Sequence, residues 1–415
     1  MPWWRGGGRN PDTRPALRVS AAARWLFVSN GHGEDHVAAT LALALRARQA
    51  SLTLAALPLV GLGAAFERAD VALLEPRLRL PSDGLTMHHP RLLWGDLRAG
   101  LARLTLAQCR ALRRARVDHV VVVGDVYAHA LASLVGAPRS VVQTLVSVRM
   151  QVPGRVALGP RRYMEGIHAL ERRLMRGRVL GVYPRDEATA AWLRTRGVAK
   201  VRWLGNVMMD GAHGGQPIAA LAGRRVAALL PGSRGHAADS ALQMLAALRR
   251  VGPIVGLVAW TRGPLPPLPE GWERCERRER GLLAAWRSGE TEVWWLSGRF
   301  ADVLASAQAA LGTTGTALEQ AAGLALPVVT FARPPLHGHR FVANQQRLLG
   351  PALRVVTPDV DAIARALADA LTDGPHRRAA ALEGPARMGP AGAAGRIADA
   401  MLAAVDASPR RSSSA

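Results

Sequence analysis

The chain has 415 residues, 49% of them hydrophobic and 20% charged, and it carries a formal net charge of +23 at pH 7. That length is enough for two α/β domains, each with its own hydrophobic core. The two cysteines, Cys109 and Cys275, stand far apart without a CxxC pair or a Cys/His cluster, which argues against a disulfide framework and a structural zinc site. We therefore expect a reducing, cytoplasmic compartment.

Arginine carries almost all of the positive charge, because Lys200 is the only lysine. Such a charge suits an anionic partner, for example a nucleotide, a nucleic acid or an anionic membrane face. Compositional bias alone would also spread arginine over both halves, as observed. No run of 18 apolar residues is present, so no transmembrane helix is expected. Residues 1–22 and 407–415 are expected to be disordered, and the first stretch lacks the apolar core of a signal peptide.

The first apolar run, residues 24–30, predicts a strand that ends in the glycine-rich loop GHGEDH, with a helix over 37–49 after it. This order of elements is the opening of a doubly wound domain. Ligands lie at the carboxyl ends of such strands, so we interpret the loop as substrate-binding. The alternative is a plain turn in which Asp35 caps the helix. The loop residues concerned are Gly31, His32, Gly33, Glu34 and Asp35.

Strands are predicted over 51–60 and 71–76, followed by a long helix over 90–116. Its leucines recur every three or four residues, with arginines between them. Two interpretations of this helix remain open. It packs on the sheet as a surface helix, or it rests on an anionic membrane with its apolar residues 92–94 at the start.

A run of valines within 117–125 predicts a central parallel strand with both faces buried. The strand places Asp125 at the carboxyl edge of the sheet, where a carboxylate with a raised pKa can take a proton from an acceptor hydroxyl. The alternative is that Asp125 caps the next helix, residues 126–135. The other elements of this half are predicted as strands over 141–146, 179–184 and 201–205 and helices over 163–175 and 186–196.

Glycines and a proline between residues 206 and 222 mark a linker to the second half. A strand from 224 then runs into Leu-Pro-Gly-Ser-Arg and a helix over 238–250. Ser233, Arg234 and the backbone N–H groups of this turn can hold a phosphate. Further strands are predicted over 254–261 and 292–297.

Residues 307–332 hold the strongest candidate site. A strand over 307–311 leads into a turn of glycines and threonines, then a helix, then a strand over 327–332. The N-terminus of that helix can bind a diphosphate, and Glu319 on its first turn can accept hydrogen bonds from two ribose hydroxyls. The alternative is a plain βαβ unit, since short glycine patterns are weak signals. The turn residues are Gly312, Thr313, Thr314, Gly315 and Thr316.

A polar segment, residues 337–350, is expected at the same edge of the second domain. Its Asn344 and Gln345 can form hydrogen bonds with a sugar or a base. Helices over 359–371 and 391–405 complete the chain.

Four short motifs, in this order, resemble the lipid-A-disaccharide synthase family, which consists of inverting glycosyltransferases with the GT-B fold. The resemblance covers residues 25–404. The motifs are the apolar strand ending in Asp125, Leu-Gly-Asn at 204–206 with Asp210, Leu-Pro-Gly-Ser-Arg at 230–234, and Gly-Thr-Ala-Leu-Glu at 315–319 with Gly323 and Pro327.

Three departures from the family pattern stand out. The first loop keeps only Asp35 of the family's Gly-Glu-Ala-Ser-Gly-Asp. Ala237 stands where the family has a glutamate, and Tyr127 where it has a proline. Because the first loop helps to bind the acceptor, we expect a divergent member and do not assume that its product is lipid A.

The resemblance implies an α/β chain of GT-B type, with two doubly wound Rossmann-like domains that face each other across a cleft. It divides the chain into an acceptor-binding domain at 23–206, a linker at 207–223, a nucleotide-sugar domain at 224–390 and a helix at 391–406 that crosses back to the first domain.

The resemblance also implies roles for the candidate residues. Glu319 would bind the UDP ribose, the turn at 312–316 would surround the diphosphate together with Ser233 and Arg234, and the 31–35 loop would bind the acceptor. Asp125 would be the base on the acceptor hydroxyl, with His32 as a second candidate. Neither a metal nor a cofactor is implied, because the helix N-terminus and an arginine would stabilise the leaving UDP.

Our first hypothesis is therefore a transferase that moves a sugar, an N-acetylglucosamine-type hexose, from a UDP-sugar to a lipid acceptor. It would act in the cytoplasm, peripherally on the inner face of the cytoplasmic membrane, and a homodimer is one expectation because dimers occur in the family. The second is a non-hydrolysing UDP-sugar 2-epimerase, which needs acids and a histidine that are not at the expected loops of the first domain. A nucleic-acid-binding protein ranks last, because aromatic residues make up only 5% of the chain. A sugar-binding protein without catalysis remains open.

Overall fold

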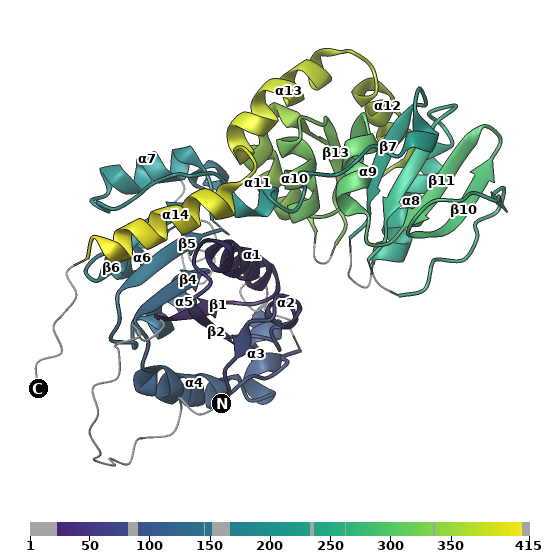
Figure 1. Cartoon of the computed structure of the whole chain (residues 1–415). Helices are drawn as coiled ribbons and strands as arrows, with labels where there is room; N and C mark the ends of the chain where they lie inside the picture. Colours follow the sequence, from purple (N-terminus) through teal and green to yellow (C-terminus); the bar gives the residue numbers. More distant parts are fainter. Residues whose placement is uncertain are drawn as a thin grey trace, which may run out of the picture.

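The computed structural model describes residues 23–81, 90–144, 146–151, 167–232, 236–261, 263–334 and 337–408. The described chain forms two α/β lobes, each built around one mainly parallel sheet (Figure 1). The first 22 residues and residues 409–415, for which disorder is expected, lie outside the described ranges.

The N-terminal lobe holds a six-stranded parallel sheet in the order β3-β2-β1-β4-β5-β6. This is the strand order of a dinucleotide-binding Rossmann sheet, whose direction of winding reverses between β1 and β4. The strands are β1 Arg24–Ser29, β2 Thr53–Pro58, β3 Ala72–Leu73, β4 His119–Val123, β5 Arg139–Gln143 and β6 Val179–Pro184. The helices are α1 His32–Arg48, α2 Ala64–Arg68, α3 Pro90–Arg98, α4 Leu101–Arg114, α5 Val126–Ala132, α6 Ala169–Leu174 and α7 Glu187–Thr195, with a 3₁₀ turn, η3, at Val148–Met150.

Strand β4 lies at the centre of this sheet and is buried throughout. Val121 and Val123 pack into the core on one face, with Phe27 of β1, while Val120 and Val122 pack into the core on the other. The two-sided burial expected from the valine run is therefore confirmed, and it fixes Asp125 just beyond the carboxyl end of the strand.

The C-terminal lobe holds an eight-stranded sheet in the order β14-β13-β12-β7-β8-β11-β10-β9. The first six strands are parallel, and β10 and β9 extend the sheet antiparallel at one edge. The strands are β7 Val226–Leu230, β8 Val255–Ala259, β9 Glu273–Arg274, β10 Leu282–Ser288, β11 Thr291–Leu296, β12 Ala309–Gly312, β13 Val328–Phe331 and β14 Leu353–Val356. The helices are α8 Ala237–Leu248, α9 Phe300–Ser306, α10 Thr316–Gly323, α11 His339–Leu349, α12 Val360–Ala370, α13 Pro375–Met388 and α14 Ala393–Asp406.

The last helix, α14, leaves the C-terminal lobe and lies along the N-terminal lobe (Figure 1). Its Ile397 and Met401 are buried in the core that contains Leu41 of α1. Asp210 caps the start of this helix, because its carboxylate accepts hydrogen bonds from the backbone N–H groups of residues 392, 393 and 394 at 2.7, 3.0 and 2.7 Å. The linker residue Asp210 thus ties the crossing helix to the junction of the lobes.

Several predicted elements differ from the structure. The helix expected over 90–116 is two helices, because Gly100 adopts a left-handed conformation with φ of 104°. The strand expected over 201–205 is only an isolated bridge between Val182 and Val201. The sequence patterns missed the edge strands β9 and β10 and the helices α9 and α13, and residues 339–349 form helix α11.

Candidate active site

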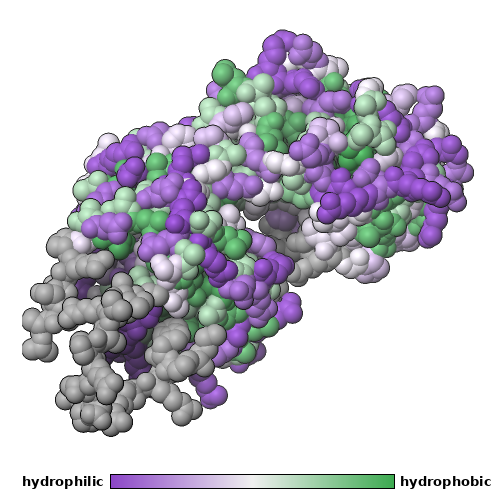
Figure 2. All heavy atoms as spheres, in the orientation of Figure 1, coloured by the Kyte–Doolittle hydropathy of each residue, from purple (hydrophilic) through white to green (hydrophobic). Residues whose placement is uncertain are grey.

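In doubly wound sheets ligands bind where neighbouring strands lead to opposite sides, beyond their carboxyl ends. That point lies between β1 and β4 in the N-terminal lobe and between β7 and β12 in the C-terminal lobe. Each of the four strands ends in a loop that the sequence marked as a candidate. Figure 2 shows the molecular surface hollowed where the two lobes meet.

In the C-terminal lobe the loops after β7 and β12 touch. A Cβ atom on Gly312 would lie 2.7 Å from the carbonyl oxygen of Leu230, so only glycine permits this approach of the two strands. Gly232 has a φ of 95°, and a Cβ there would lie 3.0 Å from Thr314. Ser233 and Arg234 lie outside the described residues. Of the Leu-Pro-Gly-Ser-Arg turn, the described residue Gly232 lies against the threonine turn.

Helix α10 begins directly after this contact, with Gly315 as its N-cap and no side chain capping it. Uncapped N–H groups and the helix dipole favour an anion at this end. The hydroxyl oxygen of Thr314 is buried and has no hydrogen-bond partner among the described residues. Thr313 is buried, with its hydroxyl 3.4 Å from the carbonyl of Pro231, and Thr316 is exposed. The backbone N–H groups at this end of α10 can therefore donate hydrogen bonds to an anionic ligand.

Glu319 lies on the first turn of α10 and is 5% exposed. Its Oε2 accepts a hydrogen bond of 2.5 Å from Nη2 of Arg185, and its Oε1 accepts one of 3.1 Å from Nε2 of Gln345. Arg185 follows β6 of the other lobe, so this ion pair joins the two lobes. Arg185 could not be predicted from the sequence, because one arginine among many before a helix is typical of a solvated residue.

Asn344 and Gln345 were expected together, but they have different neighbours. Gln345 is buried against Glu319. The side-chain oxygen of Asn344 accepts a hydrogen bond from Arg347, whose Nε donates to the carbonyl of Met150 in the N-terminal lobe at 3.1 Å. Asn344 therefore bonds the arginine that contacts the N-terminal lobe, while its neighbour Gln345 bonds Glu319.

In the N-terminal lobe helix α1 begins at His32, five residues earlier than expected, and Gly31 is its N-cap. Asp35 therefore lies in the first turn and does not cap the helix. Its Oδ1 accepts a 2.6 Å hydrogen bond from the Ser29 hydroxyl, while burial raises the pKa of Asp35 to about 7. Gly33 is exposed, and a Cβ atom there would have no described atom within 4 Å. The side chain of His32 lies outside the described part of the chain.

Glu34 on the same turn is 7% exposed. Burial raises the pKa of Glu34 to about 8, a hydrogen bond with its own backbone opposes the rise, and the charges of Asp125 and Asp35 add to it. A carboxyl with this pKa holds a proton at neutral pH. Glu34 therefore presents a neutral carboxylic acid beside Asp125.

Asp125 is 8% exposed, and its Oδ1 accepts a 2.9 Å hydrogen bond from the backbone N–H of Tyr127. The capping interaction considered for Asp125 is thus present. The loop is tightly packed, because a Cβ on Gly124 would lie 2.7 Å from the side-chain oxygen of Asn30. Capping holds the carboxylate in one orientation, which is also what a base at this position needs.

Glu171 on α6 completes an acidic group with Glu34 and Asp125. Burial, followed by the Asp125 charge, raises the pKa of Glu171 to about 8, although a 2.5 Å hydrogen bond from Gln143 opposes the rise. His129 Nε2 lies 4.0 Å from the Glu171 carboxylate, and burial lowers the pKa of that histidine to about 4. Glu171 was missed because a glutamate on an amphipathic helix ordinarily faces solvent.

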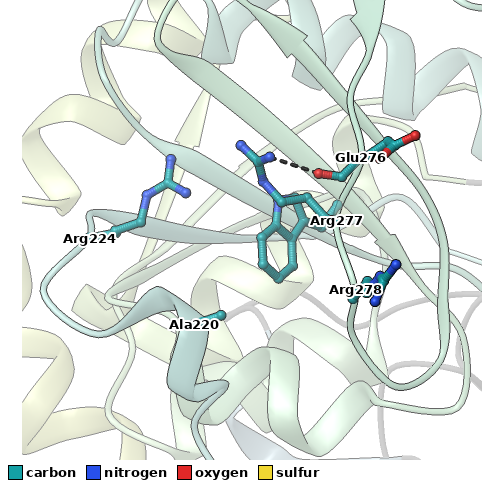
Figure 3. A pocket seen from close by; sticks show the side chains of 6 residues that line it. Ala220, Arg224, Glu276, Arg277 and Arg278 are labelled. Carbon is teal, nitrogen blue, oxygen red and sulfur yellow. Dashed lines mark hydrogen bonds between the residues drawn. The ribbon is translucent and has the colours of Figure 1, made fainter.

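A hollow of about 520 Å³ lies away from both sets of loops. It is lined by Arg224, which precedes the amino end of β7, and by residues near β9 and β11 (Figure 3). Arg277 is engaged there, since it donates to Glu292 at 2.8 and 3.0 Å and to the carbonyl of Glu276 at 2.8 Å. Ligands of this fold bind at the opposite, carboxyl ends of the strands, so this hollow is not the candidate site.

The described residues contain no group of three or more His, Cys, Asp or Glu side chains placed to hold a metal ion. None of their helices is long and apolar enough to cross a membrane.

No protein-family model matches the chain, and no curated protein matches it by sequence. Solved structures do match it over nearly its whole length. A Listeria monocytogenes protein assigned as a UDP-N-acetylglucosamine 2-epimerase has a TM-score of 0.59 at 13% identity, covering 94% of this chain and 98% of its own. The calicheamicin glycosyltransferase CalG4 has a TM-score of 0.58 at 15% identity, covering 94% and 99%. MurG from Acinetobacter baumannii has a TM-score of 0.53 at 13% identity, covering 92% and 99%. At these identities the likeness establishes the architecture, and the predicted fold is confirmed: the chain has the GT-B fold, with two Rossmann-like domains.

Proposed function

We propose that this protein is a UDP-sugar-dependent glycosyltransferase that transfers a hexose, of N-acetylglucosamine type, to a lipid acceptor with inversion. The observation that carries the proposal is the buried Glu319 on the first turn of α10, directly beyond an uncapped helix N-terminus. A carboxylate beside an anion-binding turn can accept hydrogen bonds from two ribose hydroxyls while the turn holds a diphosphate. Structures similar to this chain support the donor class, since they include a calicheamicin glycosyltransferase and a co-structure with UDP.

In the proposed reaction Asp125 takes the proton from the acceptor hydroxyl as that oxygen attacks the anomeric carbon and UDP leaves. The neutral carboxyl of Glu34 can donate a hydrogen bond to the acceptor or to Asp125. The N-terminus of α10, with Arg234 of the adjoining turn, would stabilise the charge that develops on the leaving diphosphate. His32 is kept as the second candidate base.

The acidic group also favours a second function, a UDP-sugar 2-epimerase. Such an enzyme needs acids and a histidine in its first domain, and the structure brings Glu34, Asp125, Glu171 and His129 together although the sequence separates them. Two similar solved structures from Listeria monocytogenes and Methanocaldococcus jannaschii carry that name. The products distinguish the two functions, because a transferase releases UDP while an epimerase yields an isomeric UDP-sugar.

Both proposed functions require the protein to bind the UDP part of a UDP-sugar, so UDP binding tests them together. We expect the wild type to bind UDP and Glu319→Gln to bind it about 10- to 100-fold more weakly, because two hydrogen bonds to a charged acceptor are weakened. Isothermal titration calorimetry measures this directly. Glu383→Gln is the matched control, since Glu383 pairs with Arg387 on α13 and not with the candidate site. A wild type that binds no nucleoside diphosphate would rule out the proposal.

The acceptor side of the proposal rests on one surface of the N-terminal lobe, here called the α3–α4 face. On α3, Leu93, Trp94 and Leu97 are 41%, 59% and 40% exposed, and on α4 Leu106 is 52% exposed. Between 93 and 116 the one acidic residue, Asp96, is buried. The exposed arginines of the face are Arg98, Arg103, Arg110, Arg113, Arg114 and Arg116.

Apolar side chains ringed by cations match the interface of an anionic bilayer. The helix that carries part of this face packs near the proposed base on its inner side, because Thr105 of α4 forms a 2.8 Å hydrogen bond with the hydroxyl of Tyr127, two residues after Asp125. A membrane docked on the α3–α4 face would thus bring a lipid headgroup towards the acceptor site. We propose this peripheral contact as part of the function.

Replacing Leu93 and Trp94 by serine is expected to weaken binding to phosphatidylglycerol vesicles about tenfold or more, since both side chains lose apolar burial. Vesicle co-sedimentation measures the change, and added salt should weaken the wild type as well. Leu382→Ser is the control, because Leu382 is 73% exposed on α13 of the other lobe. Equal vesicle binding by all three proteins would contradict the proposed face.

A further inference from the structure

We infer that Arg185 is a positioning residue of the donor site, supplied by the opposite lobe, which orients Glu319 for the nucleotide ribose. The inference rests on the proposed function of Glu319. In this arrangement the donor site in the C-terminal lobe is complete only when the N-terminal lobe delivers Arg185 to it.

The pair is buried on both sides. The side chains of Arg185 and Glu319 are 3% and 6% exposed, and their residues are 134 positions apart in the sequence. An arginine does not lose its charge in a protein, so a buried guanidinium without a carboxylate is strongly unfavourable. Separating Arg185 from Glu319 is therefore costly, and a ligand that keeps the pair intact binds better than one that breaks it.

The backbone that carries Arg185 is held firmly. The next residue, Asp186, is fully buried and caps α7, accepting hydrogen bonds of 2.8 Å from both the backbone N–H and the hydroxyl of Thr189. The Thr189 hydroxyl in turn accepts a 3.1 Å hydrogen bond from the N–H of Val148. The backbone at Arg185, just after the end of β6, is thus held in one position. A side chain that orients another one needs such a rigid backbone.

Glu319 retains capacity for the ribose. An ionised carboxylate offers about four acceptor positions. One bond from Arg185 and one from Gln345 occupy one position on each oxygen. Among the described residues two positions are left for two vicinal hydroxyls, in an orientation that the arginine and the glutamine together fix. Arg185 therefore acts on the donor through Glu319 and need not touch the nucleotide.

A second contact supports a closed arrangement of the lobes at this point. Arg347 of α11 donates to the carbonyl of Met150 in η3, on the same side of the junction. Helix α11 also supplies Gln345 to Glu319. The N-terminal lobe thus contacts both helices that frame the proposed ribose site, α10 and α11.

The test compares UDP with 2′,3′-dideoxy-UDP, which lacks the hydroxyls that Glu319 would bind. Arg185→Gln should weaken UDP binding about tenfold or more and leave the dideoxy compound within about twofold of its wild-type affinity. Arg185→Lys keeps the charge but lacks the planar guanidinium. Its affinity for UDP should therefore lie between those of the wild type and Arg185→Gln. The double variant Arg185→Gln/Glu319→Gln should bind UDP no more weakly than Glu319→Gln. The reason is that both substitutions remove the same interaction, the pairing of Arg185 with Glu319. Arg194→Gln, on the exposed face of α7, is the control.

Each outcome decides the matter. If Arg185→Gln binds UDP as tightly as the wild type while Glu319→Gln binds it more weakly, the inference is overturned and the proposed function still stands. Equal losses for UDP and the dideoxy compound also overturn it, because Arg185 would then act on another part of the nucleotide. A wild type that does not bind UDP refutes the proposed function itself. If Arg185→Gln does not fold, the same comparison of the two nucleotides with Arg185→Lys decides.

Discussion

Replacing Asp125 by asparagine is expected to slow sugar transfer by about 10²- to 10⁴-fold, the range that a positioned general base contributes. Asparagine keeps the size of the side chain and still accepts the hydrogen bond from Tyr127, so the cap of α5 and the fold should persist. UDP binding, which concerns the other lobe, should remain within about twofold. The measurement is the rate of UDP release with a lipid acceptor at saturating donor.

Asp118→Asn is the matched control for this experiment. Asp118 lies beside the amino end of the same strand, β4, where it accepts a hydrogen bond from the backbone N–H of Arg24 and is exposed. The substitution should change the rate by less than about twofold. If Asp125→Asn also transfers sugar at close to the wild-type rate, the base lies elsewhere and His32 becomes the first residue to test.

Glu34→Gln is expected to stabilise the protein in alkaline solution and to leave it nearly unchanged in acid. The folded protein holds the pKa of Glu34 at about 8 against a usual 4.5. Below pH 4.5 the folded and unfolded chains both keep the proton. Between pH 4.5 and 8 the unfolded chain releases the proton while the folded chain keeps it, so the free energy of unfolding falls as pH rises. Above pH 8 the loss is complete.

The size of this effect follows from the pKa difference. One pKa unit corresponds to about 1.4 kcal/mol, so burial of Glu34 costs up to about 5 kcal/mol at pH 8.5. Glutamine removes the ionisable group, and the variant should therefore unfold at higher temperature than the wild type at pH 8.5 but at nearly the same temperature at pH 4.5. Calorimetric unfolding at the two values measures the difference. Glu290→Gln, at an exposed turn of the other lobe, is the control.

Asp35 and Glu171 contribute in the same direction, because burial also raises their pKa values, to about 7 and 8. The wild type should lose stability from pH 5 to 8 by more than Glu34 alone explains. A stabilisation of Glu34→Gln that is equal at pH 4.5 and 8.5 would show that packing, and not the charge, accounts for its effect.

The local sequence was sufficient for the elements whose pattern depends on burial within one lobe. The valines of β4 point to both faces of the sheet, so they are all buried only if helices cover both faces. Strand β6 spans residues 179–184 as expected. The turn at 312–316 follows a strand and leads into a helix as predicted, and Gly312 allows β12 and β7 to approach closely. Such features follow from near neighbours along the chain, and period and residue size reveal them.

The sequence was insufficient where one residue or a remote partner changed the outcome. The leucine pattern of 90–116 continues across Gly100, yet the left-handed backbone at that glycine divides it into α3 and α4. The edge strands β9 and β10 were missed because a short antiparallel pair at a sheet edge has little burial to impose a pattern.

The sequence by itself thus determined the alternation of strands and helices around the centres of the two sheets and the loops at the carboxyl ends of β1, β4, β7 and β12. It also placed Asp125 in one of these loops and Glu319 on the first turn of the helix that follows another. Only the tertiary structure decided which groups meet there. It placed Glu34 and Glu171 around Asp125 and brought Arg185 to Glu319 from the other lobe. The physical reason is burial. A local sequence pattern predicts that a charged side chain faces solvent, and only the folded chain determines which charged groups are removed from water and need partners.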